Sequence, residues 1–256
     1  MRIVVKIGTS TLAHSTGHLN IRRVETLCKV LSDIKNAGNE VILVSSGAIG
    51  MGVGKLGLLG RPSDIPTKQA AAAVGQCELM YTYDKLFSEY NHTVAQLLIT
   101  GDDVASEKRR GNFINTMNRL LELQALPILN ENDTVSTDEI VIGDNDTLAA
   151  IVAESVKADL LILLSDIDGL YTADPHKDPS ARRLTHVPAL TEEIYCLAGV
   201  SASSQGTGGM VTKLQAARIC LDSGCAMVIA NGNRPENLYD IIDGKPIGTL
   251  FGEVTL

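Results

Sequence analysis

The sequence predicts an α/β protein in which helices cover both faces of a mostly parallel β-sheet. Two observations lead to this fold class. Short and almost continuously apolar runs recur along the chain, as expected of strands that are buried on both faces. Segments with helical periodicity separate these runs, which favours helical crossovers between parallel strands. The predicted strands span residues 3–7, 41–45, 94–98, 126–129, 160–164 and 226–230.

The helical pattern is clearest over residues 21–37, where side chains such as Val24 and Leu27 fall on one apolar stripe and Gly38 follows as a stop signal. Further helices are predicted for residues 67–90, 109–124, 145–156 and 210–222. Residues 248–254 are expected to supply a last strand. Ligands of such folds bind at the carboxyl ends of the strands, so the segments that follow the strands are the candidates for function.

Composition and charge exclude several classes of protein. The chain has 256 residues, of which 45% are hydrophobic and 20% charged, so it can bury a large core and is neither disordered nor a coiled-coil rod. Its 22 basic and 30 acidic residues give a net charge of −8, the opposite sign to that of a typical nucleic-acid binder, and no nucleic-acid partner is expected. No apolar run reaches the ~18 residues of a membrane helix, so no membrane partner is expected. Five scattered cysteines and the lack of a signal peptide predict a reducing, cytoplasmic location.

Two glycine-rich segments can bind an anion through backbone N–H groups. The first, residues 45–57, contains five glycines and directly follows a predicted strand, and a mobile surface loop is the alternative interpretation. In the second, residues 206–213, three glycines precede a predicted helix and Lys213 lies one turn into it. A helix start with a solvated lysine is the alternative there. Neither segment matches the dinucleotide-binding or P-loop motif.

Lys6 and an acidic segment are the other candidates. A lysine inside an apolar strand is costly unless its charge is paired or reaches a functional cleft, and the alternative is an edge position with the ammonium in water. The acidic segment, residues 130–146, lacks the spacing of an EF-hand calcium loop. Two interpretations of it stay open: a solvated turn with Asp144 as a helix N-cap, or a site that binds a substrate amine and positions phosphates.

The remaining catalytic patterns are missing from the sequence. The five histidines show no metal-binding spacing, and no metal site is predicted. No serine lies in a GxSxG motif, so covalent hydrolysis is unsupported. Two glycine-rich anion segments, two lysines and an acidic segment on a parallel α/β core suggest phosphoryl transfer without a P-loop.

Six motifs occur in a fixed order: VVKIGTS, VSSGAIGMG, LNENDTVST, GDNDTLAA, LLSDIDGLYTADP and GTGGMVTKLQAA. Together they resemble the amino acid kinase family over nearly the whole chain; the combination of NEND, GDND and GTGGMxTK is specific, although each alone is weak. The resemblance implies a three-layer α/β/α sandwich that forms a single domain over residues 1–256. About residues 1–157 would form the substrate lobe and about residues 158–256 the nucleotide lobe. The chain ends before a C-terminal PUA domain of the kind that many relatives carry, and none is expected.

Within the family, the motifs resemble those of kinases that use ATP to phosphorylate the γ-carboxylate of L-glutamate, the first step of proline biosynthesis. This resemblance makes Lys6, Asp146 and Lys213 catalytic, with Asp146 holding the two lysines. It implies that glutamate is bound by Ser46, Gly47, Ala48, Asp133 and Asn145. It implies that the nucleotide is bound by Lys6, Gly8, Thr9, Ser165, Asp166, Tyr171, Thr207, Gly208, Gly209, Met210, Val211, Thr212 and Lys213.

The chemistry agrees with these roles. A γ-carboxylate with a pKa of ~4.3 is already ionised at neutral pH, so the reaction needs no general base. Mg²⁺ carried mainly by the ATP phosphates, together with the lysines and backbone N–H groups, would neutralise the transferring phosphoryl group. The resemblance further implies a homo-oligomer, in which residues 67–90 either form the contact or only cover the sheet. It also implies hand-off of the labile acyl phosphate to a glutamyl-phosphate reductase.

Two alternatives remain open at this point. One is another carboxylate, carbamate or UMP kinase of the same superfamily. A UMP kinase would need basic residues to hold a second phosphate, for which Arg109 and Arg110 are candidates, although a solvated helix start is the favoured interpretation of this pair. The other is a non-catalytic nucleotide or amino-acid sensor built on the same fold. The presence of Lys6, Asp146 and Lys213 together argues against a sensor, which has no need of the transfer machinery.

Overall fold

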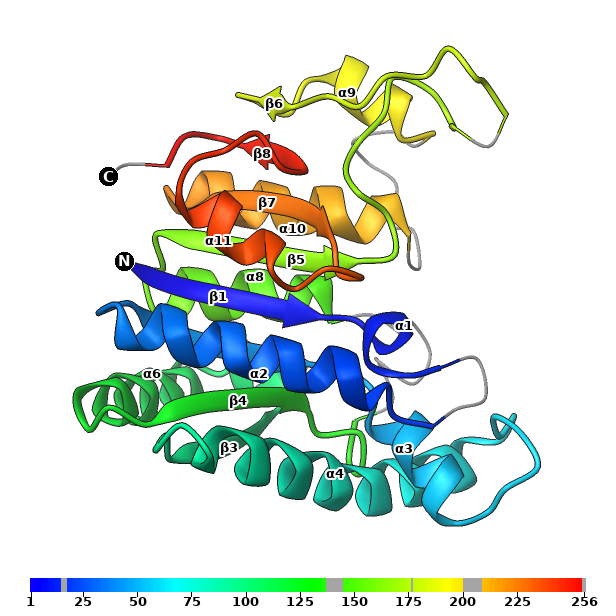
Figure 1. Ribbon diagram of the computed structural model, residues 1–256, viewed down its shortest axis with the longest axis vertical. Coiled ribbons are helices and arrows are strands. Elements are labelled where there is room, and N and C mark those ends of the chain that lie inside the picture. The colour runs from blue at the N-terminus through cyan, green and yellow to red at the C-terminus, as the bar shows by residue number, and fades with distance from the viewer. Residues whose placement is uncertain (15–17, 137–144, 176, 200–208, 255–256) are drawn as a thin grey trace.

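The computed structural model describes residues 1–14, 18–136, 145–175, 177–199 and 209–254. Its strands are β1 (Arg2–Ile7), β2 (Glu40–Ser45), β3 (Val94–Ile99), β4 (Leu126–Glu131), β5 (Leu160–Ser165), β6 (His186–Val187), β7 (Ala226–Asn231) and β8 (Thr249–Phe251). They form one sheet in the order β3-β4-β2-β1-β5-β7-β8-β6 (Figure 1). Every neighbouring pair is parallel except β7 with β8, so the prediction of a mostly parallel sheet is confirmed.

The predicted strands all form, and the observed ends of all but the last lie within two residues of the expected ones. The last strand, β8, ends at Phe251, three residues before the expected end at residue 254. The prediction for β3 is wrong in one respect, because this strand is not buried on both faces. It lies at the edge of the sheet beside β4, and its Gln96 and Leu98 side chains are exposed. An apolar run alone does not distinguish an edge strand from a central one, since both can carry aliphatic side chains.

The helices are α1 (Thr9–Leu12), α2 (Ile21–Asn36), α3 (Ala48–Lys55), α4 (Ile65–Ser88), α5 (Gly101–Ala105), α6 (Glu107–Glu122), α8 (Asp146–Ser155), α9 (Glu192–Leu197), α10 (Met210–Asp222) and α11 (Asn237–Ile242). The five predicted from periodicity are α2, α4, α6, α8 and α10. The helices α1, α5, α9 and α11 and the two-residue β6 were not predicted, because segments this short carry too few residues for a periodic pattern.

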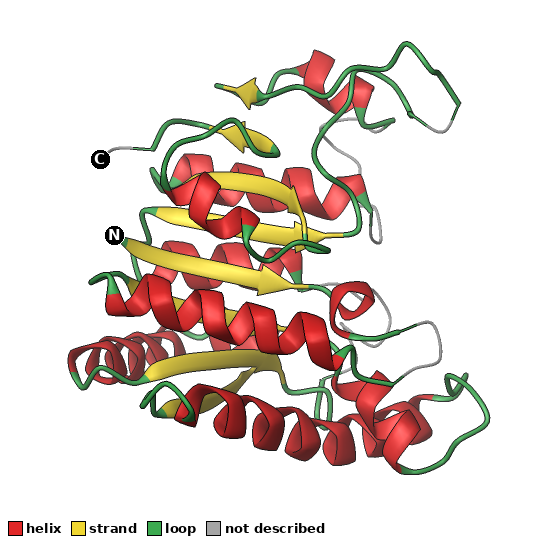
Figure 2. Cartoon of the chain, viewed as in Figure 1, coloured by secondary structure: helices red, strands yellow, loops and turns green. Residues whose placement is uncertain are grey.

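Helices cover both faces of the sheet in three layers (Figure 2). One hydrophobic core joins the sheet to α2, α4 and α11, and the other joins it to α6, α8 and α10. Successive residues of β1 alternate between them, with Val5 in the first core and Val4 in the second. The next residue on the Val4 face is Lys6, so the strand period directs its side chain toward α8 and α10.

Residues 45–57, expected to form a glycine-rich loop, are mostly helical, and this correction changes what their glycines do. Helix α3 packs against α4 backbone to backbone, since a Cβ on Gly52 would lie 1.7 Å from the carbonyl oxygen of Ala71. A Cβ on Gly75 of α4 would lie 1.8 Å from the carbonyl oxygen of Ala48. Gly52 and Gly75 therefore permit a close helix crossing, whereas Gly47 lies at the strand end, where it can approach a ligand.

Among the described residues, no helix has the length and apolarity needed to cross a membrane.

Candidate active site

The segments expected to carry function gather at one end of the sheet. Because β1, β2, β4 and β5 are parallel, the residues that follow them emerge at the same edge. Helices α1 and α3, which begin directly after β1 and β2, lie beyond this edge (Figure 1). The first turns of α8 and α10 reach the same region, where Asp146 contacts both Lys6 and Lys213.

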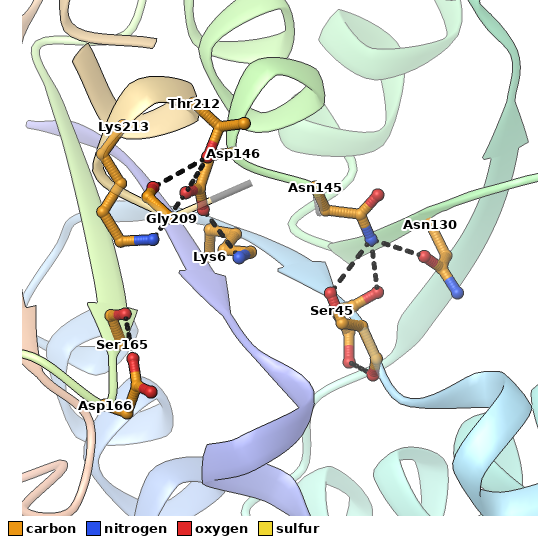
Figure 3. A network of polar contacts seen from close by, with 11 residues as sticks. Lys6, Ser45, Asn130, Asn145, Asp146, Ser165, Asp166, Gly209, Thr212 and Lys213 are labelled. Atoms are coloured by element: carbon orange, nitrogen blue, oxygen red, sulfur yellow. Dashed lines mark hydrogen bonds and ion pairs between the residues drawn. The ribbon is translucent and has the colours of Figure 1, made fainter. Parts of the chain in front are cut away.

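Lys6, Asp146 and Lys213 form a buried ionic cluster (Figure 3). Lys6 Nζ lies 2.6 Å from Asp146 Oδ1, and Lys213 Nζ lies 2.9 Å from Asp146 Oδ2. The residues are 6%, 1% and 6% exposed, respectively. A single carboxylate thus brings two ammonium groups together away from bulk water, where their field is only weakly screened.

Local structure explains how three distant residues converge. Lys6 points to this face by the strand period, and Asp146 is the first residue of α8, where a carboxylate is favoured by the helix dipole. Lys213 lies in the first turn of α10, beside Thr212, whose hydroxyl donates to Asp146 Oδ2 at 3.3 Å. The expectation that Asp146 holds both lysines agrees with this geometry.

Asn145 lies next to this cluster along the chain and is fully buried. Its Nδ2 donates to Asn130 Oδ1 at 2.8 Å, to Ser46 Oγ at 3.2 Å and to the Ser45 carbonyl at 3.4 Å. Its Oδ1 has no hydrogen-bond donor among the described residues. A buried acceptor without a donor is costly, so this oxygen is suited to a ligand that brings an N–H group.

Asp133 offers a second acceptor of the same kind. It lies just after β4, is only 5% exposed, and its Oδ1 has no donor within the described part of the chain. Burial, and then the nearby Glu131 carboxylate, raise the pKa of Asp133 to about 6. The carboxylate is ionised at neutral pH but poorly compensated, which favours a cationic ligand.

Ser46, Gly47 and Ala48 form the junction between β2 and α3. Gly47 has a φ of 102°, a conformation that favours glycine, and Ala48 begins the helix. The first backbone N–H groups of α3 have no intrahelical acceptor and are available to an anionic group. The junction contacts Asn145 through Ser46, so four of the five residues expected to bind one substrate touch or adjoin one another.

A cavity of about 610 Å³ lies beside the residues that follow β5. Asp166, Tyr171 and Met210 line it, together with other residues between positions 167 and 177, three of which are charged, and with residues 197–199 at the end of α9. Ser165 ends β5 and donates to Asp166 Oδ1 at 2.9 Å, and the Tyr171 hydroxyl donates to Asp168 Oδ1 at 3.0 Å. Apolar walls with a few fixed polar groups are typical of a small-molecule site.

The other residues expected to bind phosphates occupy two helix starts. Gly8 precedes α1, which begins at Thr9, and a Cβ on Gly8 would lie 3.8 Å from Lys6 Nζ. Gly209 precedes α10 with a φ of 72°, and Met210 and Val211 begin that helix. Thr207 and Gly208 lie outside the described residues.

A family model supplies the assignment that the geometry alone leaves open. The model of the amino acid kinase family matches residues 1–231. The chain belongs to the amino acid kinase family. Among curated relatives, this amino acid kinase is 53% identical to the glutamate 5-kinase of Clostridium perfringens, over 98% of this chain and 94% of the relative. It is 51% identical to the glutamate 5-kinase of Listeria monocytogenes, over 98% of this chain and 92% of the relative.

Solved structures confirm the fold of the amino acid kinase. The carbamate kinase from Giardia lamblia bound to AMP-PNP matches with a TM-score of 0.70 at 17% identity, and the match covers 98% of each chain. Identity this low establishes the shared architecture and nothing about the acceptor. The expected three-layer α/β/α sandwich is therefore confirmed.

Sequence reasoning missed the polar residues behind the site. The sequence places Asn130 in an acidic segment and Gln76 and Tyr83 in a predicted helix, and it assigns no role in the site to any of them. In the structure Asn130 bonds both Asn145 and Gln76, and the Tyr83 hydroxyl lies 2.9 Å from Ser45 Oγ. The available signal was Gln76 itself, a polar residue at a position where the helical spacing calls for an apolar one.

Proposed function

We propose that this amino acid kinase transfers the γ-phosphoryl group of ATP to the γ-carboxylate of L-glutamate, forming L-glutamyl 5-phosphate and ADP. The observation that carries the proposal is the buried meeting of Lys6 and Lys213 on Asp146, at the end of the sheet where the glutamate-binding and nucleotide-binding segments converge. Similarity to glutamate 5-kinases over nearly the whole chain supports the choice of acceptor.

The acceptor pocket favours a free amino acid. Asp133 and Asn145 each present a buried oxygen that has no donor among the described residues, and each oxygen suits an α-ammonium group. An N-acylated substrate has no positive charge and only one N–H, so it would leave the Asp133 carboxylate uncompensated. The N-terminal N–H groups of α3, beside Ser46 and Gly47, suit the α-carboxylate.

The transfer step needs no proton acceptor. An oxygen of the ionised γ-carboxylate attacks the γ-phosphorus, a carboxyl oxygen–phosphorus bond forms, and the bond to the β-phosphate oxygen breaks as ADP leaves with that electron pair. Lys6, next to Gly8 and α1, is assigned to the transferring group, and Lys213 at the start of α10 to the nucleotide phosphates. Asp146 keeps both ammonium groups in position, and with two lysines on its oxygens it is not placed to act as a base.

The nucleotide is assigned to the cavity beyond β5, with Ser165, Asp166 and Tyr171 on the nucleoside side and residues 207–213 around the phosphates. Within the described residues, no group of three His, Cys, Asp or Glu side chains is arranged to hold a metal ion. Mg²⁺ usually keeps most of its ligands from phosphates and water, so it would fit here as an ion carried by the nucleotide. When bound, it would supply charge neutralisation on the phosphates.

The experiment that tests this function is an ADP-release assay with Mg·ATP and a panel of acceptors. The panel contains L-glutamate, N-acetyl-L-glutamate, L-aspartate, carbamate and UMP. We expect turnover with L-glutamate and at most trace turnover with the others. Preferred turnover of carbamate or UMP would replace the proposed acceptor, and tight ATP binding without turnover of any acceptor would favour a sensor.

Further assignments follow from this reaction. About residues 1–157 would form the substrate lobe and about residues 158–256 the nucleotide lobe of a single domain. The reaction would serve the first step of proline biosynthesis, and its labile acyl phosphate would pass to a glutamyl-phosphate reductase. Assembly into a homo-oligomer is also proposed, and light scattering on the purified protein would test it.

A further inference from the structure

We propose that Gln76 of α4 is a positioning residue: by accepting from Asn130 Nδ2 it helps the Glu131 N–H to hold the Asn130 amide, whose oxygen in turn holds the Asn145 amide with Oδ1 toward the substrate ammonium. The inference deepens the proposed function and rests on it for the identity of the substrate. Gln76 is placed on the hidden side of the pocket and is assigned no contact with either substrate.

The chain of contacts begins at a group whose polarity is fixed. The backbone N–H of Glu131 can only donate, and it donates to Asn130 Oδ1 at 2.9 Å. This contact determines which end of the Asn130 amide is oxygen. Asn130 Nδ2 is thereby directed toward α4, where it donates to Gln76 Oε1 at 2.9 Å.

The same oxygen of Asn130 then orients Asn145. Asn145 Nδ2 donates to Asn130 Oδ1 at 2.8 Å, and it also lies 3.4 Å from the Ser45 carbonyl, which can only accept (Figure 3). Both neighbours demand the nitrogen on this side of Asn145. The oxygen must occupy the other side, where it is buried without a donor among the described residues.

A reversed Asn145 amide would harm substrate binding in two ways. It would set its oxygen against Asn130 Oδ1 and the Ser45 carbonyl, and it would present an N–H₂ group to an ammonium ion. Gln76 prevents this indirectly. Without an acceptor at Gln76, the buried Asn130 Nδ2 has no partner there, and rotation of Asn130 removes the shortest of the three bonds that hold Asn145.

The position of Gln76 supports a role beyond space filling. It lies on the buried stripe of α4 with Ala72, Leu79 and Tyr83, in a helix that packs against the sheet. An apolar side chain at this position would avoid the desolvation of a primary amide. The buried amide of Gln76 is explained by the need of Asn130 Nδ2 for an acceptor.

The test compares Gln76→Met and Gln76→Leu with Gln76→Glu. The Met and Leu side chains keep the apolar bulk but remove the acceptor, whereas the Glu side chain keeps an oxygen that can accept from Asn130. We expect the glutamate KM to rise about 10-fold in Gln76→Met and Gln76→Leu, the scale of a buried donor left unpaired, and to stay within about threefold in Gln76→Glu. The ATP KM should be unchanged in all three variants.

A second measurement separates positioning from general damage. In an Asn145→Ala background, Gln76→Met should raise the glutamate KM no further, because the group it positions is gone. Equal effects of Gln76→Met in both backgrounds would overturn the proposed positioning role of Gln76. Parallel increases in the KM of glutamate and of ATP would overturn it as well. Failure of the wild-type enzyme to phosphorylate glutamate would overturn the proposed function instead, and with it the substrate on which the positioning role of Gln76 rests.

Discussion

Lys6 Nζ lies 2.6 Å from Oδ1 of Asp146, and this contact joins the central strand of the sheet to the first turn of α8. Lys213 reaches the other oxygen of the same carboxylate from α10. The two ammonium groups would repel each other without the carboxylate, so Asp146 both pairs them and sets their separation. A phosphoryl group that arrives at the end of the sheet meets charges that are already oriented, which lowers the cost of reorganisation during transfer.

Replacing either lysine by methionine should lower kcat without unfolding the protein. We expect Lys6→Met and Lys213→Met each to reduce kcat by about 100- to 1000-fold, the scale of one lost charge-stabilising donor in a transition state. Melting temperatures from circular dichroism serve as the control, because the neutral side chain fills similar space. Near-normal kcat in a folded variant would remove that lysine from the mechanism.

Asp133→Asn should weaken glutamate binding and stabilise the protein at the same time. The change removes the charge that meets the substrate ammonium, so the glutamate KM should rise at least about 10-fold, as for a lost charged hydrogen bond. The ATP KM should stay the same. A change in the ATP KM alone would show that Asp133 binds the nucleotide and not glutamate.

The stability effect has a defined pH dependence. The pKa of Asp133 is about 6 in the folded protein against an ordinary value of 3.8, so between these values the folded state holds the proton more strongly and its stability falls as pH rises. At pH 7 Asp133→Asn should therefore be more stable than wild type by ~1–3 kcal/mol in urea unfolding. This advantage should disappear below pH ~4, where the acid is protonated in both states. An advantage that persists at low pH would have another cause.

The same pKa predicts how activity depends on pH. The value of kcat/KM for glutamate reports groups of the free enzyme, and it should fall as the pH drops through about 6 because Asp133 gains a proton. In Asp133→Asn this fall should be absent. The substrate γ-carboxylate remains ionised until pH ~4.3 and does not mask the effect.

The sequence predicted the sheet and the ends of its central strands because burial on both faces leaves a simple apolar pattern. It also predicted the convergence of Lys6, Asp146 and Lys213, but only through motifs, since strand and helix periods alone do not say which loops meet. Helix α3 was missed because its glycines, read as a loop signal, serve a close crossing with α4. Gln76 was missed because its partner Asn130 is 54 residues away in the chain.

Gly75→Ala tests whether that crossing positions the substrate pocket. The new Cβ would lie 1.8 Å from the Ala48 carbonyl oxygen, so α3 must move, and with it the Gly47–Ala48 junction. We expect a lower melting temperature and a higher glutamate KM. Gly111→Ala in α6 is the matched control, because its Cβ meets nothing within 4 Å. It should stabilise the protein by up to ~1 kcal/mol, the helix-propensity gain of alanine over glycine, with both KM values unchanged. An unchanged glutamate KM in Gly75→Ala would separate the α3–α4 crossing from substrate binding.

Tyr171 provides the test of the nucleotide cavity. Tyr171 lines the cavity, and its hydroxyl donates to Asp168 Oδ1. Asp168 Oδ2 lies 3.6 Å from Arg183 Nη1. If the ring flanks the base, Tyr171→Phe should keep the ATP KM within about threefold, because it keeps the aromatic surface and loses one hydrogen bond at a partly exposed site. Tyr171→Ala should raise the ATP KM about 10-fold, the scale of one lost base-stacking contact, and leave the glutamate KM unchanged. Wild-type ATP KM values in both variants would show that the Tyr171 ring does not contact the base. An increase of the same size in both would instead assign the effect to the hydroxyl and its bond to Asp168.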